Sequence, residues 1–279
     1  MFTKTYADIL TTIERAHHVL IVSHQKPDGD TIGSALALRQ YCLRLGKSVT
    51  NHCVNPAPDY MLFLPDAHQL GPQPAIWNSS EVDVVIVVDS GDLRYAGVAD
   101  YMSQLPGSYT LVNIDHHVTN PGYGQLNLVD STASSTCEIV YHLLNSVQAV
   151  DHAIATCLLT GLITDTGNLT NLATTASAVE VASKLVAKGA NLSLISKHAV
   201  QNRPFNTLRL WGRALERLHE DKETGMIVTA LTLQDIHECN ADDEAVSGIS
   251  NFLNGLDQAA HKAILVLTQT APDVIKGSL

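Results

Sequence analysis

The 279-residue sequence is short of basic residues. Its 17 Lys and Arg stand against 28 Asp and Glu, which gives a formal net charge of −11. A groove that holds long nucleic acid must neutralise many phosphates with Lys and Arg, so this charge argues against such a partner. Short oligonucleotides and nucleotide phosphates stay compatible with it, because bound divalent cations would supply local positive charge.

Long apolar runs and paired cysteines are also absent from the sequence. No run approaches the 18 apolar residues expected of a membrane span, and the N-terminus lacks the basic and apolar regions of a secretory signal. The 5 cysteines are odd in number and have no C-x-x-C spacing, which indicates reduced thiols rather than a zinc cluster. We therefore expect a cytoplasmic protein without a membrane partner.

Strand and helix patterns alternate through the first two-thirds of the chain. An amphipathic helix is expected at the N-terminus and another helix over 29–45, with strands at 18–24, 48–54, 83–89 and 109–115. This alternation predicts an α/β fold with a mostly parallel sheet and flanking helices. In such sheets, ligands bind beyond the carboxyl ends of the strands.

Helices dominate from residue 133 onward. The pattern Ser135-x-x-Glu138 is typical of a capping box and predicts a helix to Leu144. Further helices are expected over 151–163, 177–188 and parts of 190–222, and strands at 225–232 and 261–270 flank a helix at 242–256. We therefore predict a main domain at 1–188, a helical linker at 189–222 and a smaller α+β domain at 223–279.

Three apolar strands deliver acids or imidazoles at their carboxyl ends. Charged and polar groups are costly beside a buried strand unless something binds or uses them. Carboxylate together with imidazole suits Mn²⁺ or a similar ion. The strand at 18–24 ends in His24, with Asp28 and Asp30 close behind it. The strand at 83–89 ends in Asp89, and the strand at 109–115 ends in Asp115, which His116 and His117 follow. Their convergence predicts one shared site of the two-metal phosphoesterase type.

Several of these positions also have ordinary structural interpretations. Asp28 and Asp30 fit turn chemistry and helix capping, which are common in Pro-Asp-Gly-Asp. Asp89 and Asp165 could each cap a helix or lie in a loop. Adjacent histidines at a strand end have no such common structural role, which favours the metal interpretation.

Three further residues each have a structural and a functional interpretation. Arg94 and Asn120 are polar loop residues that could be solvated or could contact a phosphate, which the guanidinium of Arg suits. Gly33 lies in the first turns of a helix whose N-terminus favours anions, and helix packing explains it equally well.

Four segments match a known pattern. HQKPDGDTIGS, VVIVVDSGDLR, NIDHHVTNPGYG and LLTGLITDTGN resemble, in order and spacing, the four motifs of the DHH-family phosphoesterases. The resemblance covers roughly residues 15–190. It is strongest to the short, stand-alone bacterial members, which are nanoRNases that also hydrolyse 3′-phosphoadenosine 5′-phosphate.

The resemblance implies a ligand set and a reaction. Two Mn²⁺ ions are expected, with Mg or Co also compatible, and they activate a hydroxide that hydrolyses short oligoribonucleotides (nanoRNA) and 3′-phosphoadenosine 5′-phosphate. Asp115 would orient the cluster, and His117 would face the substrate phosphate. From their loop positions, Arg94 and Asn120 stay candidate substrate contacts. By similarity, His24 and Asp28 would hold the first ion, Asp30, His116 and Asp165 the second, and Asp89 would bridge them.

The same resemblance leaves alternatives open. Cyclic di-AMP or pApA hydrolysis is the enzymatic alternative, whereas pyrophosphatases and long-strand exonucleases are less similar over the whole sequence. Family members continue into an associated domain with a glycine-rich GGGH-type segment, which this sequence lacks before its end at DVIKGSL. We therefore expect a partial, truncated substrate-binding domain, and a nucleotide-binding module with little turnover is the non-enzymatic alternative. A homodimer is compatible with the sequence.

Overall fold

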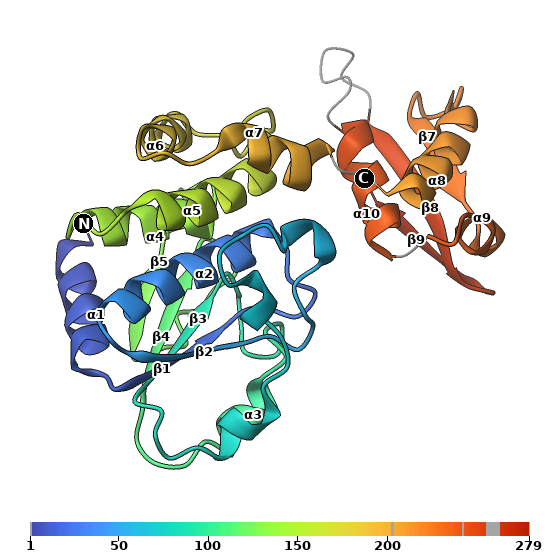
Figure 1. Ribbon diagram of the computed structural model, residues 1–279. Helices are drawn as coiled ribbons and strands as arrows, with labels where there is room; N and C mark the ends of the chain where they lie inside the picture. The colour runs from blue at the N-terminus through green and yellow to red at the C-terminus, as the bar shows by residue number, and fades with distance from the viewer. Residues whose placement is uncertain (1, 202–203, 242, 255–262, 279) are drawn as a thin grey trace. The chain divides into compact units, whose positions relative to one another are not determined.

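The computed structural model describes residues 2–201, 204–241, 243–254 and 263–278. It divides the chain into two compact units, Met1–Gln201 and Asn202–Leu279 (Figure 1). The expected fold class is confirmed, since a parallel sheet with helices forms the first unit and a smaller sheet with helices forms the second. The residues expected to form a linker, 189–222, are divided between the two units.

The sheet of the N-terminal unit has five parallel strands in the order β2-β1-β3-β4-β5. The chain order reverses between β1 and β3, and the crevice beyond their carboxyl ends is where such sheets bind ligands. Four strands were predicted, whereas the four-residue β5 was missed after a loop rich in Pro and Gly. The strands are β1 (His18–Val22), β2 (Ser48–His52), β3 (Val84–Val88), β4 (Thr110–Asp115) and β5 (Leu126–Val129).

Helices cover both faces of this sheet, and Figure 1 shows α2, α4 and α5 over one face and α3 on the other side. The helices are α1 (Thr3–Arg15), α2 (Gly29–Arg44), α3 (Ala99–Met102), α4 (Thr136–Asn145), α5 (His152–Asp165), α6 (Ala176–Ala187) and α7 (Leu192–Ile195), which continues into a π-helical segment (Ser196–Gln201). Short 3-10 turns lie at Asp59–Met61, Ala67–Gln69 and Pro74–Asn78.

Both faces of the strands are buried, as parallel sheets require. In β1, Val19 and Ile21 pack against α2 and α5, whereas Leu20 and Val22 pack with Trp77 on the opposite face. The cysteines are all free and buried, in agreement with the expected reduced thiols.

Glycines allow α2 and α5 to cross at very short distance. A Cβ on Gly33 would lie 2.5 Å from the Cys157 carbonyl oxygen, and a Cβ on Gly161 would lie 2.9 Å from the Asp30 Cα. Gly33 therefore serves helix packing. The crossing fixes Asp30, near the start of α2, relative to α5.

Helix ends differ in part from the predicted pattern. Ser135 accepts a hydrogen bond from the Glu138 N–H, as a capping box requires, but the Glu138 carboxylate accepts from the Ser134 N–H instead of that of Ser135. The reciprocal half of the predicted box is therefore absent at this helix. Asp28 caps α2 by accepting from the N–H groups of Asp30 and Thr31.

The C-terminal unit contains a four-stranded sheet in the order β6-β7-β8-β9. Strands β7 and β8 are parallel, and the outer pairs are antiparallel. The two predicted strands and the predicted helix are present, although residues 242, 255, 256, 261 and 262 of those predictions lie outside the described residues. The helices and strands of the C-terminal unit are α8 (Phe205–Glu216), β6 (His219–Glu220), β7 (Ile227–Leu231), α9 (Leu233–Cys239), α10 (Asp243–Asn254), β8 (Ile264–Ala271) and β9 (Val274–Ser278).

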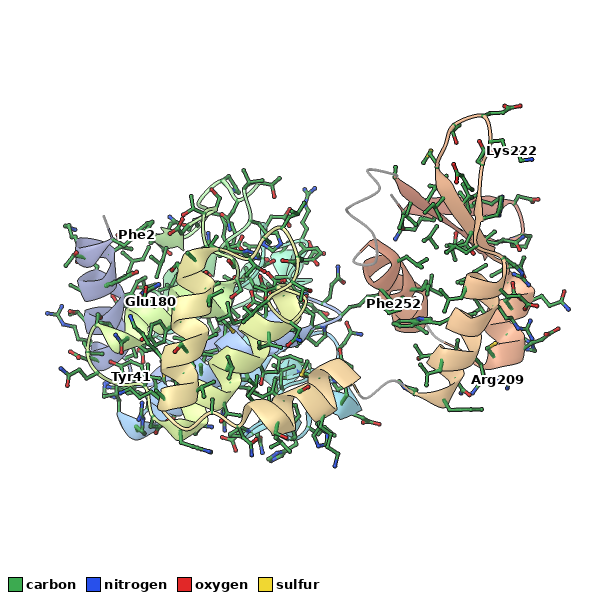
Figure 2. The ribbon with its side chains drawn as sticks, turned by 90° about the horizontal axis from the view of Figure 1, so that it is seen from above. Phe2, Tyr41, Glu180, Arg209, Lys222 and Phe252 are labelled. Atoms are coloured by element: carbon green, nitrogen blue, oxygen red, sulfur yellow. The ribbon has the colours of Figure 1, made fainter. Side chains whose placement is uncertain are left out.

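The core of the C-terminal unit is built between α8, α10 and the sheet. Phe252, labelled in Figure 2, stacks on Trp211 with ring centroids 5.2 Å apart. The Trp211 indole N–H donates to the Ala245 carbonyl at 2.8 Å, which ties α8 to α10. Among the described residues of both units, no helix is long and apolar enough to cross a membrane.

Asp235 is a buried carboxylate that joins α8 to α9. It accepts hydrogen bonds from Arg213 and Arg217, and it also accepts from the N–H and hydroxyl of Thr232, which completes a capping box on α9. The pKa of Asp235 is lowered, mainly by the Arg217 guanidinium, against an opposing effect of burial.

Replacing Asp235 with Asn is expected to lower the free energy of unfolding of the C-terminal unit by about 2–4 kcal/mol, because two arginines lose a buried partner. Since the folded-state pKa is depressed, this stabilisation is fully present above the unfolded pKa of about 3.9, begins to decline below it, and is lost completely only as the pH falls through the much lower folded-state pKa. Urea unfolding at pH 7 and at pH 3 measures both effects, and the difference in stability between wild type and variant should shrink by about 1 kcal/mol at pH 3. Glu238→Gln is the control, since Glu238 is more exposed and the change should cost less than about 1 kcal/mol.

Candidate metal centre

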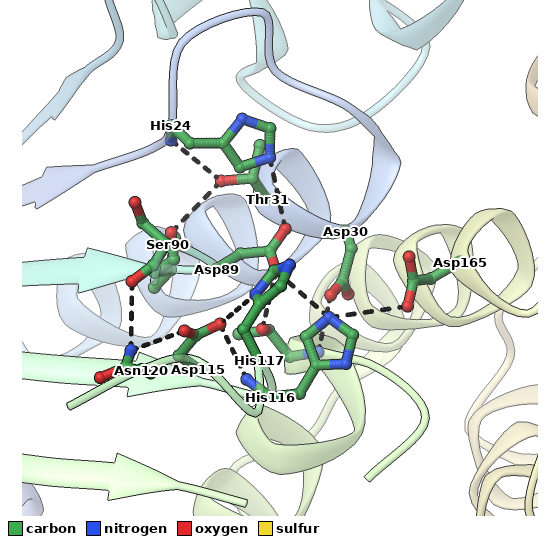
Figure 3. Close-up of polar contacts among 12 residues, drawn as sticks. His24, Asp30, Thr31, Asp89, Ser90, Asp115, His116, His117, Asn120 and Asp165 are labelled. Carbon is green, nitrogen blue, oxygen red and sulfur yellow. Dashed lines mark hydrogen bonds and ion pairs between the residues drawn. The ribbon is translucent and has the colours of Figure 1, made fainter. Parts of the chain in front are cut away.

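The predicted acids and imidazoles lie together beyond the carboxyl ends of β1, β3 and β4, and Figure 3 shows most of them. They come from the segment after β1, from the first turns of α2, from the ends of β3 and β4, and from the last turn of α5. Asp165 is the final residue of α5 rather than a residue beyond the helix. Groups of donor atoms within 4.8 Å of one another are formed by His24, Asp28 and Asp89, by Asp89, His116 and His117, and by Asp30, His116 and Asp165.

Asp89 belongs to two of these groups. Its Oδ2 is 3.5 Å from His24 Nε2, and its Oδ1 is 3.6 Å from His116 Nε2. The residue has a φ of +54°, a left-handed conformation that Asp and Asn adopt more readily than other side chains. The Thr136 hydroxyl donates to Oδ1 at 3.0 Å. One buried carboxylate thus presents its two oxygens to different imidazoles.

His24 is buried, and only one of its ring nitrogens faces the carboxylates. Its Nδ1 lies 2.8 Å from the Gln25 carbonyl oxygen, which can only accept a hydrogen bond. Nε2 is therefore the nitrogen directed at Asp89 and at Asp28 Oδ1, 3.7 Å away. This arrangement is typical of metal-binding histidines, whose second nitrogen donates to a backbone carbonyl or carboxylate. Burial alone lowers the pKa of His24, but Asp28 and Asp89 outweigh it and raise the pKa to about 11.

Asp30 lies at the N-terminus of α4 as well as in α2. Its two oxygens accept from the N–H groups of Thr136 at 2.6 Å and Cys137 at 2.9 Å. These bonds and the positive end of the helix dipole stabilise the carboxylate. Burial, together with Asp89 and Asp165, nevertheless raises its pKa well above the ordinary value.

Asp165 completes the second side of the cluster. Its Oδ2 is 3.8 Å from His116 Nε2. Burial raises the pKa of Asp165 to about 6, with His116 opposing this rise and Asp89 adding to it. Neighbouring carboxylates add to the effect of burial on the pKa of Asp30 and of Asp165, and a bound cation would stabilise both ionised forms.

The donor set fits divalent metal ions. The separations of 3.5–3.8 Å between imidazole nitrogens and carboxylate oxygens are too long for hydrogen bonds. Ligands about 2.1 Å from a common ion are separated by roughly 3–4 Å, depending on the angle between them. Oxygen and imidazole donors without thiolate suit Mn²⁺, Mg²⁺ or Co²⁺ better than a structural zinc site.

The His117 ring is paired with the Asp115 carboxylate. Its Nδ1 lies 2.7 Å from Asp115 Oδ1, which also accepts from the His116 N–H at 2.8 Å. This pairing leaves Nε2 of His117 as the nitrogen available to a substrate, and the side chain is 42% exposed. The pKa of His117 is raised, first by its hydrogen bond to Asp115.

The two expected phosphate contacts differ in their surroundings. Arg94 is exposed on the turn that Asp92 caps, and its guanidinium makes no hydrogen bond or ion pair with any described residue. Asn120 lies behind Asp115 and donates to its Oδ2 at 2.6 Å. The structure thus gives the Asn120 amide protein partners instead of leaving it solvated.

Sequence reasoning missed three contributors to the cluster. Thr136 was considered only as part of a helix start, although Ser-Ser-Thr before an apolar helix indicates free N–H donors that an acid can use. Tyr95 lies with its ring centroid 5.0 Å from that of His24. Asn113 is fully buried in β4, where a polar residue in the run TLVNI is the signal that could have revealed it.

A parallel α/β sheet whose strand ends carry a cluster of carboxylates and imidazoles is typical of enzymes that bind divalent metal ions. The family model described as "DHH family, N-terminal domain" matches residues 18–162. The chain belongs to the DHH family, and the resemblance seen in the four motifs is confirmed.

Individual relatives agree with this assignment. The chain is 31% identical over 254 residues to a Thermus thermophilus protein named bifunctional oligoribonuclease and PAP phosphatase NrnA, covering 90% of this chain and 74% of the relative. It is 26% identical over 245 residues to the cyclic-di-AMP phosphodiesterase PdeA of Listeria monocytogenes, covering 78% and 36%. A crystal structure of an exopolyphosphatase-related protein from Bacteroides fragilis has the same fold, with a TM-score of 0.87, 24% identity and coverage of 98% and 82%.

Proposed function

We propose that this phosphoesterase depends on Mn²⁺ and hydrolyses short oligoribonucleotides and 3′-phosphoadenosine 5′-phosphate. The observation that carries the proposal is the position of Asp89, whose two oxygens face His24 on one side and His116 on the other. A single carboxylate shared in this way suits a pair of ions rather than one. The proposed ligands are His24 and Asp28 for one ion and Asp30, His116 and Asp165 for the other, with Asp89 common to both.

Divalent cations held by these groups would supply positive charge for the phosphoryl oxygens and lower the pKa of a water molecule. The chain's own residues orient the substrate around them. His117 is proposed to donate from Nε2 to a phosphate oxygen, since Asp115 occupies its Nδ1 and raises its pKa. Arg94, which is exposed and without a described side-chain partner, is proposed to bind a second phosphate oxygen.

The proposed substrate class follows from charge and from the relatives. A net charge of −11 disfavours a long polyanion, whereas divalent cations held by the cluster would neutralise one or two phosphates. The Thermus thermophilus relative is named for oligoribonuclease and PAP phosphatase activities. Cyclic di-AMP or pApA hydrolysis is the second candidate, supported by the name of the Listeria monocytogenes relative.

A panel of purified substrates separates these activities. The protein, stripped with EDTA and reloaded with Mn²⁺, is expected to hydrolyse di- and trinucleotides and 3′-phosphoadenosine 5′-phosphate at least about tenfold faster than cyclic di-AMP or pyrophosphate. The stripped protein should be inactive, and Mn²⁺ should restore it more effectively than Mg²⁺, because mixed carboxylate and imidazole sites suit Mn²⁺.

Two results would contradict the proposal. Faster turnover of cyclic di-AMP than of dinucleotides would favour the second candidate. Nucleotide binding without hydrolysis in saturating Mn²⁺ would instead identify a nucleotide-binding module.

A further inference from the structure

A chain of three asparagines ends on the carboxylate that holds His117. Asn113 in β4 donates to Asn120 Oδ1 at 2.9 Å and to Asn127 Oδ1, in β5, at 3.2 Å. Asn120 in turn donates to Asp115 Oδ2 at 2.6 Å, as Figure 3 shows. The polar groups therefore run from β5 through β4 to the Asp115–His117 pair.

The amide of Asn120 has no spare hydrogen-bonding capacity. A side-chain amide donates two hydrogen bonds and accepts two. The Nδ2 of Asn120 has Asp115, the Asn113 Oδ1 and the Ser90 carbonyl within reach, at 2.6, 3.2 and 3.2 Å. Its Oδ1 accepts from Asn113 Nδ2 and from the Gly122 N–H. Asn120 is thus fully engaged by the protein, which argues against a direct phosphate contact.

Asn120 also joins the two loops that carry the cluster. Ser90 directly follows Asp89, and its carbonyl accepts from Asn120 and from the Tyr123 hydroxyl at 3.0 Å. On the other side, Asp115 is completely buried, and its Oδ2 has Asn120 as its donor while Oδ1 serves His117. Rotation of the Asp115 carboxylate would break one of these bonds, so Asn120 sets the direction in which His117 points.

We infer that Asn120 is a positioning residue, which fixes Asp115 and through it the His117 ring that the proposed function places against the substrate phosphate. Groups behind an active side chain typically change activity by 10–100-fold when removed. Asn120→Ala is therefore expected to lower kcat by about 10–100-fold while changing KM by less than about threefold.

A double-mutant cycle with His117 tests this role. His117→Ala, Asn120→Ala and the double variant are compared on a dinucleotide in Mn²⁺, with melting temperatures measured for each. Residues that act as one unit are non-additive, so Asn120→Ala should cost less than about threefold further in the His117→Ala background. Asn120→Asp keeps the shape but turns an acceptor toward Asp115, and it should lose at least as much activity as Asn120→Ala.

The matched control is Asn78→Ala, an exposed asparagine at the end of a 3-10 turn, which should retain full activity. If Asn120→Ala fails to fold, Asn127→Ala repeats the cycle two hydrogen bonds further away, through Asn113, with a smaller loss and the same non-additivity. An increase in KM with kcat unchanged, or losses that multiply in the double variant, would overturn the inference. An inactive wild type would instead refute the proposed function.

Discussion

Asp89→Asn is expected to reduce hydrolysis by about 10³-fold, the upper end of the range for loss of one key electrostatic group in an active site. The variant removes one negative charge from the position that both proposed ion sites share. It should also weaken Mn²⁺ binding at both sites, which isothermal titration of the EDTA-stripped protein measures.

The fold should survive this substitution. Asn matches Asp in size and tolerates the left-handed φ of +54° at this position. Circular dichroism and the melting temperature check this directly. Asp100→Asn, an exposed position in α3, is the control and should leave turnover and Mn²⁺ binding unchanged. Turnover of Asp89→Asn within tenfold of the wild type would reject Asp89 as the shared ligand.

Gly161→Ala is expected to lower turnover by about 10²-fold or more and to destabilise the N-terminal unit by about 1–3 kcal/mol. The new Cβ would lie 2.3 Å from Cys137 Sγ and 2.9 Å from both Cα and Oδ1 of Asp30. Ordinary contacts need roughly a further 1 Å, so α2 must move away from α5 and carry Asp30 with it. A displacement of about 1 Å at a catalytic group can reduce the rate about 10²-fold.

The control for this prediction is Gly212→Ala in α8, where nothing lies within 4 Å of the added Cβ. There the intrinsic preference of Ala for a helix should stabilise the C-terminal unit by about 0.5–1 kcal/mol. Urea unfolding and steady-state turnover of both variants supply the comparison. Full activity in Gly161→Ala would show that the crossing of α2 and α5 does not set the position of Asp30.

The convergence of the site was predictable from sequence because it follows from topology. Parallel strands end at the same edge of a sheet, so His24, Asp89 and His116 must approach one another once β1, β3 and β4 are neighbours. The strand patterns at these three segments are strongly apolar, and their type was predicted correctly. Sequence patterns place Asp28 and Asp30 near this edge, but not the orientation of their side chains.

The capping and metal interpretations of Asp28 turned out to be compatible. Its Oδ1 accepts from the N–H groups of Asp30 and Thr31 and also lies 3.7 Å from His24 Nε2. A turn pattern such as Pro-Asp-Gly-Asp carries no information about what else its carboxylates face. The contact of Asp28 with His24 therefore becomes visible only in the folded structure.

The elements that sequence reasoning missed are short or lie at sheet edges. Strand β5 has four residues, β6 has two, and β9 exposes Val274 and Ile275. Such strands depend on their neighbours for stability, so their local pattern is weak. The asparagine chain was missed for a related reason: Asn113, Asn120 and Asn127 are spaced irregularly, and only the pairing of β4 with β5 brings them together.

The most direct test of the two-ion site is the anomalous scattering of crystals grown with Mn²⁺. Two peaks are predicted in the crevice beyond β1, β3 and β4, with an oxygen of Asp89 contacting each. His24 and Asp28 should accompany one peak, and Asp30, His116 and Asp165 the other. A single peak, or peaks that Asp89 does not contact, would contradict the account.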